Sequence, residues 1–123
     1  KKPLFSVAER MDMIREAAEE MGVDPNRIEV DSFDGLLVNY ARSRDARVIL
    51  RGLRAVADFE YELQMANMNR HLNHEVETVF IMADDAYFYV ASTLVKEVAR
   101  LGGDVADLVP SSVQPRLLAK FDK

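Results

Sequence analysis

Ala46-Arg47-Val48-Ile49-Leu50-Arg51-Gly52-Leu53-Arg54 is the stretch that decides the fold. Its first part, residues 46–50, is apolar and β-branched enough to form a short strand buried in a parallel sheet. In open α/β sheets, ligands bind just outside the carboxyl ends of the strands. Arg51 and Arg54 follow that strand, and the guanidinium of an arginine offers a rigid fork of donors that matches phosphate oxygens. Gly52 permits close approach to the backbone. The stretch therefore predicts a phosphate-binding site at the rim of the sheet, in preference to a pair of ordinary surface charges.

A second candidate anion site is the segment Ala91-Ser92-Thr93-Leu94-Val95-Lys96, at a predicted strand-to-helix junction. Free backbone N–H groups and the helix dipole attract phosphate to the N-terminus of a helix. Lys96, one turn later, would add a positive charge there. The alternative is that Ser92 or Thr93 merely caps the helix, and the sequence leaves both readings open.

The rest of the chain alternates helices with short strands. We expect helices over residues 7–21, 35–44, 58–72 and 94–101, strands over 27–30, 46–50 and 76–82, and short helical segments over 104–123. The first helix has the clearest boundaries, because Ser6 and Glu9 form a capping box and Gly22 supplies a stop. This alternation predicts an α/β layer fold with a parallel sheet, built as one domain over residues 1–123.

The predicted helix 58–72 carries two apolar stripes. One contains Phe59, Leu63 and Ala66; the other contains Tyr61, Met65, Met68 and Leu72. Either one stripe packs on the sheet and the other on another subunit, or the helix is deeply buried within the monomer. Glu62, placed in the first turn, either stabilises the helix dipole, accepts hydrogen bonds from a ribose, or orients a neighbouring arginine.

Composition excludes several classes of protein. The net charge of -5 and the pI near 5.0 argue against a general nucleic-acid binder. The absence of cysteine excludes disulfides and thiolate zinc sites. No apolar run reaches the roughly 20 residues that span a bilayer, and no signal peptide is visible. His71 and His74 are expected to face solvent, because no suitable carboxylate cluster accompanies them. Neither a phosphate-binding Walker loop nor a nucleophile elbow occurs.

Three segments resemble bacterial phosphopantetheine adenylyltransferase: residues 49–70, residues 89–99 and the opening Lys1-Lys2-Pro3-Leu4-Phe5. The resemblance covers essentially the whole chain, and its most specific part is residues 51–62. It implies a Rossmann-like nucleotidyltransferase fold and the transfer of the adenylyl group of ATP to 4′-phosphopantetheine. The products would be dephospho-coenzyme A and pyrophosphate, within coenzyme A biosynthesis. It further implies a magnesium cofactor, coenzyme A as a further ligand, a homohexamer and a cytoplasmic location.

The resemblance also implies roles for individual residues. Lys1 and Arg51 would hold the phosphate of phosphopantetheine, Leu37 would line the pantetheine site, and Lys1 and Arg54 would be catalytic. The positions implied for ATP binding are Gly52, Leu53, Arg54, Glu62, Tyr87, Phe88, Tyr89, Val90, Ala91, Ser92 and Thr93. Residues 91–96 resemble the family's Ser-Ser-Thr-x-x-Arg signature, with Ala91 in place of the first serine and Lys96 in place of the arginine.

The family's Thr-x-Gly-His motif, whose histidine stabilises the transition state, is absent from this sequence. Because the chain also begins at Lys1 without methionine, we expect it to be the C-terminal portion of such an enzyme, inactive alone, with a sheet that lacks the first strand–helix unit. Three alternatives stay open. They are a related nucleotidyltransferase with another phosphate acceptor, a non-enzymatic α/β module that binds adenine nucleotide or coenzyme A, and an oligomerisation domain built on the helix 58–72.

Overall fold

The computed structural model describes residues 2–87 and 90–122, so the predicted site residues Lys1, Phe88 and Tyr89 lie outside the described residues. Its elements, in chain order, are α1 (Val7–Glu20), α2 (Leu37–Ser43), β1 (Val48–Leu53), α3 (Val56–Leu72), β2 (Glu77–Met82), the 3₁₀ helix η1 (Asp85–Tyr87), α4 (Ser92–Arg100) and α5 (Val113–Phe121). The chain forms two compact units. The sheet unit is Phe33–Val90, and the helical unit combines Lys1–Ser32 with Ala91–Lys123. The single-domain expectation stays a prediction.

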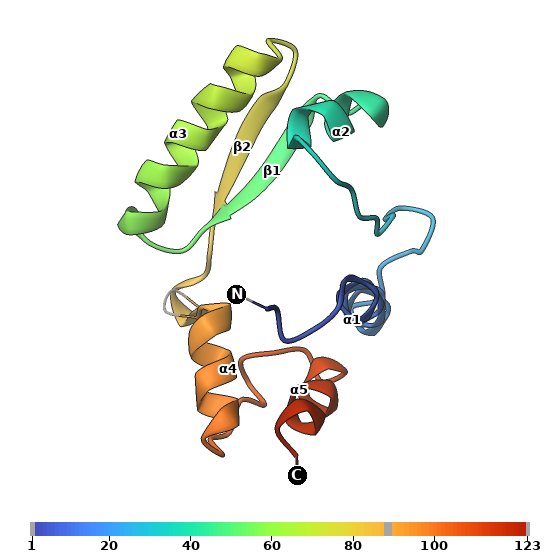
Figure 1. Cartoon of the computed structure of the whole chain (residues 1–123), viewed down its shortest axis with the longest axis vertical. Helices are drawn as coiled ribbons and strands as arrows, with labels where there is room; N and C mark the ends of the chain where they lie inside the picture. Colours follow the sequence, from blue (N-terminus) through green and yellow to red (C-terminus); the bar gives the residue numbers. More distant parts are fainter. Residues whose placement is uncertain (1, 88–89, 123) are drawn as a thin grey trace. The chain divides into compact units, whose positions relative to one another are not determined.

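The sheet unit is built on two parallel strands. β1 pairs with β2 from Val48 opposite Glu77 to Leu53 opposite Met82, and α3 makes the connection between them (Figure 1). A parallel pair needs such a crossover, because the second strand must start at the same end as the first. The predicted α/β fold with a parallel sheet is therefore confirmed.

β1 is placed differently from the prediction. It begins at Val48 and continues through Leu53, so Arg51 lies inside the strand rather than after it. The prediction of residues 46–50 was wrong at both ends, because pairing with β2, from Glu77 to Met82, sets the limits of the strand and local preference does not. Arg51 stands opposite Phe80 in the ladder. Since side chains alternate between the faces of a strand, Arg51 shares its face with Ile49.

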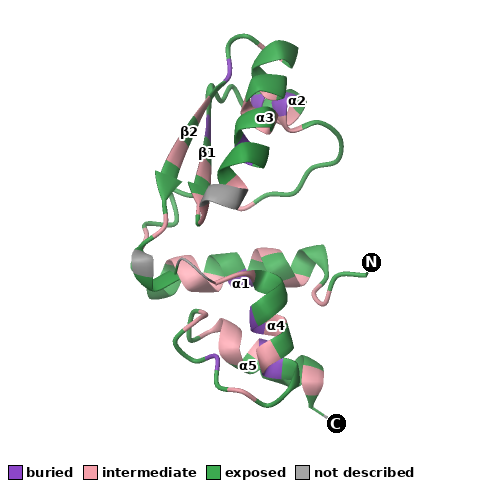
Figure 2. Cartoon of the chain, turned by 90° about the vertical axis from the view of Figure 1, so that its left-hand side faces the viewer, coloured by how far each residue is buried: buried purple, intermediate pink, exposed green. Residues whose placement is uncertain are grey.

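The two faces of the sheet differ in burial, so buried or half-buried residues alternate with exposed ones along most of each strand (Figure 2). On one face Ile49 is buried and joins Ala41 of α2 and Val76 in a small core, with Leu37 packed against it. On the other face the apolar side chains are exposed; they are Val48, Leu50, Val79 and Ile81. Parallel sheets are usually covered on both faces, so a one-sided cover in the described part of the chain is unusual.

The predicted strand 27–30 is wrong. Residues 28–34 carry no helix or strand assignment, and the sheet of the described residues consists of β1 and β2 alone. Ile28 and Val30 show the alternation of a strand, but a strand also needs a hydrogen-bonded neighbour, which local sequence cannot provide.

α3 begins at Val56, two residues before the predicted start, and its Phe59 packs edge-on against Phe80 with ring centroids 6.3 Å apart. Among the α3 residues whose burial is described, Glu62 alone is buried, and Tyr61 and Met68 are more than half exposed. The alternative of a helix deeply buried within the monomer is therefore wrong. Contact of this helix with another subunit stays a prediction.

The helical unit begins with the predicted capping box. The Ser6 hydroxyl accepts from the backbone N–H of Glu9, and the Glu9 carboxylate accepts from the N–H of Ser6. Gly22, at φ +74°, ends α1 in the left-handed conformation that favours glycine. Glu16 of α1 holds Arg116 of α5 in a two-point ion pair. No helix in the described part of the chain is long and apolar enough to cross a bilayer.

Candidate phosphate-binding site

The sheet unit orients Arg51 through a carboxylate of α3. Arg51 Nε donates to Glu62 Oε1 at 2.6 Å, and its Nη2 donates to Oε2 at 2.8 Å. The Glu62 side chain is 8% exposed and that of Arg51 is 42% exposed, so the carboxylate end is buried while the guanidinium reaches solvent. Of the three readings of Glu62, the structure shows the one in which it orients a neighbouring arginine. The first-turn placement was wrong, because α3 starts earlier and Glu62 falls in its second turn.

The ion pair also fixes the charge state of Glu62. Hydrogen bonds from Arg51 hold the pKa of this carboxyl below its usual value, although burial and the nearby charge of Asp58 act in the opposite direction. Hydrogen bonding to the charged form of an acid is the reason for such a shift. Glu62 is therefore ionised at neutral pH. Arg51 Nη1 makes no hydrogen bond within the described residues, so it remains available to a ligand.

Arg54 lies just beyond the carboxyl end of β1 and is held from two sides. Its Nη1 donates to the backbone carbonyl of Val90 at 2.7 Å. Its Nε and Nη2 lie 3.3 and 3.5 Å from the two carboxylate oxygens of Asp58, which also accepts from the Arg54 backbone N–H at 3.3 Å. The contact with Val90 ties the strand end to the segment that the resemblance assigns to ATP.

Gly52 stands between the two arginines and faces open space. A Cβ built on this glycine would meet no heavy atom within 4 Å, and its φ lies outside the left-handed region. The backbone of β1 therefore does not require glycine here for its own conformation. An open approach to the main chain is what a ligand needs in order to lie against it.

Two pockets meet at this glycine. One, of about 420 Å³, is lined by Arg51, Gly52, Arg54, Asp58, Tyr61 and Glu62. The other, of about 360 Å³, lies at the ends of both strands and is lined by residues 50–54 and 81–83. The three rim residues Arg51, Gly52 and Arg54 belong to both pockets, so the structure brings the centre of the predicted site together. Leu53 joins them in the second pocket.

Leu37 is not among the lining residues of these pockets. It opens α2 and packs on the core cluster that contains Ile49 and Val76, near the amino ends of the strands. Tyr87 ends η1 and is exposed. The roles predicted for Leu37 and Tyr87 in substrate binding stay predictions.

The start of α4 differs from the capping alternative. The helix runs from Ser92 to Arg100, its N-cap is Ala91, and no side chain caps it. Ser92 and Thr93 are thus the first two residues of the helix, and the reading in which one of them caps it is wrong. Their backbone N–H groups belong to the set that a helix leaves without internal partners. These residues belong to the helical unit, and their role in ATP binding stays a prediction.

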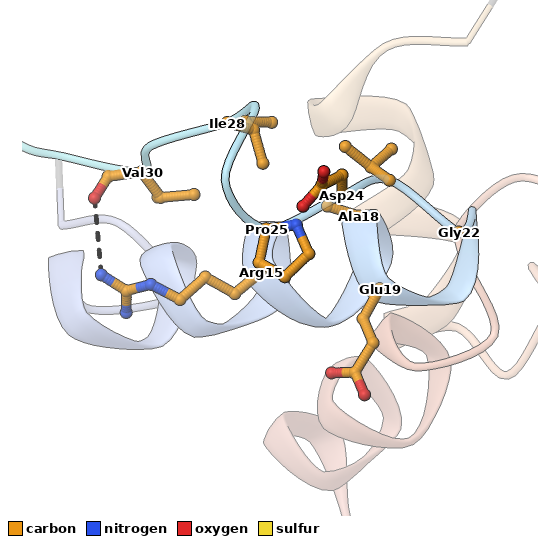
Figure 3. Close-up of a pocket in the computed structure, with 9 residues that line it drawn as sticks. Arg15, Ala18, Glu19, Gly22, Asp24, Pro25, Ile28 and Val30 are labelled. Atoms are coloured by element: carbon orange, nitrogen blue, oxygen red, sulfur yellow. Dashed lines mark hydrogen bonds between the residues drawn. The ribbon is translucent and has the colours of Figure 1, made fainter.

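The helical unit contains a larger pocket of about 800 Å³ between α1 and the segment that follows it (Figure 3). Arg15 donates from Nη1 to Asp12 at 3.3 Å and from Nη2 to the carbonyl of Val30 at 3.4 Å. The other charged residues of this pocket are the acids Glu19 and Asp24. None of the predicted site residues lines it, and one engaged arginine among acids is a poor site for phosphate.

One family match indicates the general class of reaction. Residues 1–98 match the family described as cytidylyltransferase-like. The matched range includes the whole sheet unit and most of α4. The chain belongs to this family. The cytidylyltransferase-like family carries out nucleotidyl transfer, so its reactants are polyanions, and oriented arginines at the rim of its parallel sheet suit them.

Within this cytidylyltransferase-like chain, Asp58 is a site residue that the sequence interpretation missed. Its position four residues before Glu62 was a usable signal, since residues four apart lie on one face of a helix.

The residues of this family member offer no dedicated metal site in the described part of the chain. No group of three or more histidine, cysteine, aspartate or glutamate side chains there is close enough to hold an ion. His71 and His74 are exposed, as predicted.

Proposed function

We propose that this cytidylyltransferase-like protein transfers the adenylyl group of ATP to 4′-phosphopantetheine, giving dephospho-coenzyme A and pyrophosphate. The observation that carries the proposal is the rim of the sheet, where Arg51 and Arg54 are held rigidly on either side of Gly52 beside an open pocket. The choice of ATP and phosphopantetheine rests on the sequence resemblance over residues 49–70 and 89–99.

The reaction needs no nucleophile from the protein. A phosphate oxygen of phosphopantetheine attacks the α-phosphorus of ATP, a new P–O bond forms, and the bond to the bridging oxygen of the β-phosphate breaks as pyrophosphate leaves. The protein has to bring two anions together and reduce their repulsion, which is catalysis by positioning and electrostatics. In the proposal Arg51 holds the acceptor phosphate and Arg54 contacts the ATP phosphates. Lys1 would add a charge on the acceptor side.

Mg²⁺ is part of the proposal as an ion carried by the substrate. It commonly keeps several waters and binds through substrate phosphates with one or two carboxylates. When bound, the ion would neutralise charge on the leaving pyrophosphate. A homohexamer and a cytoplasmic location are the further proposals that the resemblance supplies.

The decisive experiment is a turnover assay with ATP, 4′-phosphopantetheine and Mg²⁺, in which chromatography detects dephospho-coenzyme A. It is run on the chain alone, which we expect to be inactive, and on the chain with an N-terminal segment that carries the Thr-x-Gly-His motif restored. CTP in place of ATP, and dephosphorylated pantetheine in place of the acceptor, are the matched controls. Product with ATP and the phosphorylated acceptor alone supports the proposal. Turnover of a different phosphate acceptor from a substrate panel would instead identify a related nucleotidyltransferase.

Binding without turnover, even when the Thr-x-Gly-His segment is restored, is the outcome that favours the second candidate, a non-enzymatic module for adenine nucleotide or coenzyme A. Isothermal titration with ATP, dephospho-coenzyme A and coenzyme A measures it directly. A chain that binds none of these ligands would contradict both candidates and leave oligomerisation as its role.

A further inference from the structure

Two carboxylates of α3 each hold one arginine of the β1 terminus. Glu62 binds Arg51 through Nε and Nη2, at 2.6 and 2.8 Å. Asp58 lies 3.3 and 3.5 Å from Nε and Nη2 of Arg54. Both carboxylates therefore face the same edge of a guanidinium, the side that carries Nε and one terminal nitrogen.

The spacing of these residues is set by regular secondary structure. Asp58 and Glu62 are four residues apart, so they share one face of α3 about 6 Å apart along its axis. Arg51 and Arg54 are three residues apart, about 10 Å along an extended chain. The helix therefore provides two fixed acceptors for two side chains that leave the strand end at a larger separation.

The pairing lowers the net charge of the site. Two arginines and two carboxylates line the pocket of about 420 Å³, so their formal charges cancel. Free arginines would attract an anion more strongly than paired ones, because each carboxylate repels the ligand. What the carboxylates add is orientation, since each long side chain loses most of its conformational freedom before a ligand arrives.

We propose that Asp58 and Glu62 are positioning residues that fix the separation of the Arg51 and Arg54 guanidiniums, so that two anionic reactants meet at a set distance. This inference rests on the proposed function. In it, Arg51 presents Nη1 to the acceptor phosphate, and Arg54, anchored also on the Val90 carbonyl, faces the phosphates of ATP. Catalysis of this kind depends on geometry within about 1 Å.

The test compares Asp58→Asn and Glu62→Gln with two matched controls. Glu16→Gln removes the charge and one acceptor from the equivalent two-point contact with Arg116, at 3.0 and 2.8 Å, and Asp12→Asn makes the same change at an exposed partner of Arg15. For each variant, in the form that turns over in the assay above, kcat is measured well below its Tm. The Kd for inorganic tripolyphosphate is measured by titration, and the Nε–H signals of the arginines are followed by NMR.

The two α3 variants should lose about tenfold or more in kcat while binding tripolyphosphate at least as tightly as the wild type. Tighter or unchanged binding separates positioning from a merely structural role, because a loosened fold weakens binding together with turnover. The Arg51 Nε–H signal should shift in Glu62→Gln and stay in place in Glu16→Gln. Rates equal to those of the controls, or parallel losses in kcat and anion affinity, would overturn the inference.

Failure of the proposed function is distinguishable from failure of this inference. If the wild type forms no product even with the Thr-x-Gly-His segment restored, the proposed function fails and the NMR readout decides alone. Tripolyphosphate that brings the Arg51 and Arg54 signals to one defined position in the wild type and the controls, but broadens them or moves them to a different position in Asp58→Asn and Glu62→Gln, supports positioning. Equal responses in all chains contradict it.

Discussion

Gly52→Ala should make the folded protein more stable and weaken ligand binding. Because these two effects have opposite directions, this substitution is the sharpest test of the site. The added Cβ would meet no heavy atom within 4 Å, and the φ of this residue suits any amino acid. An alanine there restricts the unfolded chain without straining the folded one. A ligand that lies against the strand end, however, would meet a methyl group where it now finds open space.

The structure sets the size of both effects. Replacement of glycine by alanine at a compatible backbone position stabilises a protein by about 0.4–1 kcal/mol. For a chain of this length that corresponds to a rise in Tm of about 2–4 °C. A methyl group that intrudes on a snug ligand costs about 1–3 kcal/mol, so the Kd for ATP should rise about 5- to 150-fold.

Calorimetry measures both quantities on the same sample, and Gly103→Ala supplies the contrast. A Cβ at Gly103 would lie 2.5 Å from Val98 Cγ1 and 3.2 Å from the Val98 carbonyl oxygen, so this variant should lower Tm and leave the Kd for ATP unchanged. If Gly52→Ala raises Tm and binds ATP as tightly as the wild type, no ligand lies against this strand end. The reasoning about the site would then be refuted.

Three further predictions concern the charged residues. Arg54→Ala should slow adenylyl transfer by more than about tenfold, because one donor to a developing charge is lost; an unchanged steady-state rate would remove Arg54 from the mechanism. Arg51→Ala should mainly weaken the binding of 4′-phosphopantetheine. If isothermal titration shows weaker binding of ATP alone, that assignment of Arg51 is contradicted. Because Arg51 holds the pKa of Glu62 below its usual 4.5, the ion pair contributes stability above pH 4.5 that is lost as the pH falls through the lowered folded-state value. The free energy of unfolding of Glu62→Gln, measured by urea titration, should therefore fall less steeply below pH 4.5 than that of the wild type; equal slopes would speak against the pair.

The parts of the fold that sequence predicted are those with local causes. The capping box of Ser6 and Glu9 and the stop at Gly22 involve residues within one helical turn of each other, so the sequence contains both partners of each contact. The alternation of helices and strands likewise follows from the period of apolar residues. The Arg51–Arg54 rim was found because the end of a strand and a pair of arginines are both visible in one short segment.

The errors arose where a distant partner decides the outcome. Residues 27–30 have the pattern of a strand but no partner in the sheet of the described residues, whereas β1 continues through Gly52 because β2 pairs with it. Neither fact is encoded in the segment itself. An isolated preference for strand structure is too weak to replace pairing with a neighbour.

The burial of Glu62 does not follow from the apolar pattern that predicted helix α3. The apolar stripes of this helix predicted that one of them packs on the sheet, but among the α3 residues whose burial is described the one that is buried is a carboxylate. A buried charge is tolerated when it is paired and hydrogen-bonded, and Arg51 supplies both conditions from the neighbouring strand. Apolar packing would stabilise this position equally well, since a buried ion pair is weak support for stability. The best explanation for the Glu62 carboxylate is therefore that it holds Arg51. The same ion pair also fastens α3 to β1, so this helix can stay attached to the strand while most of its apolar residues are exposed.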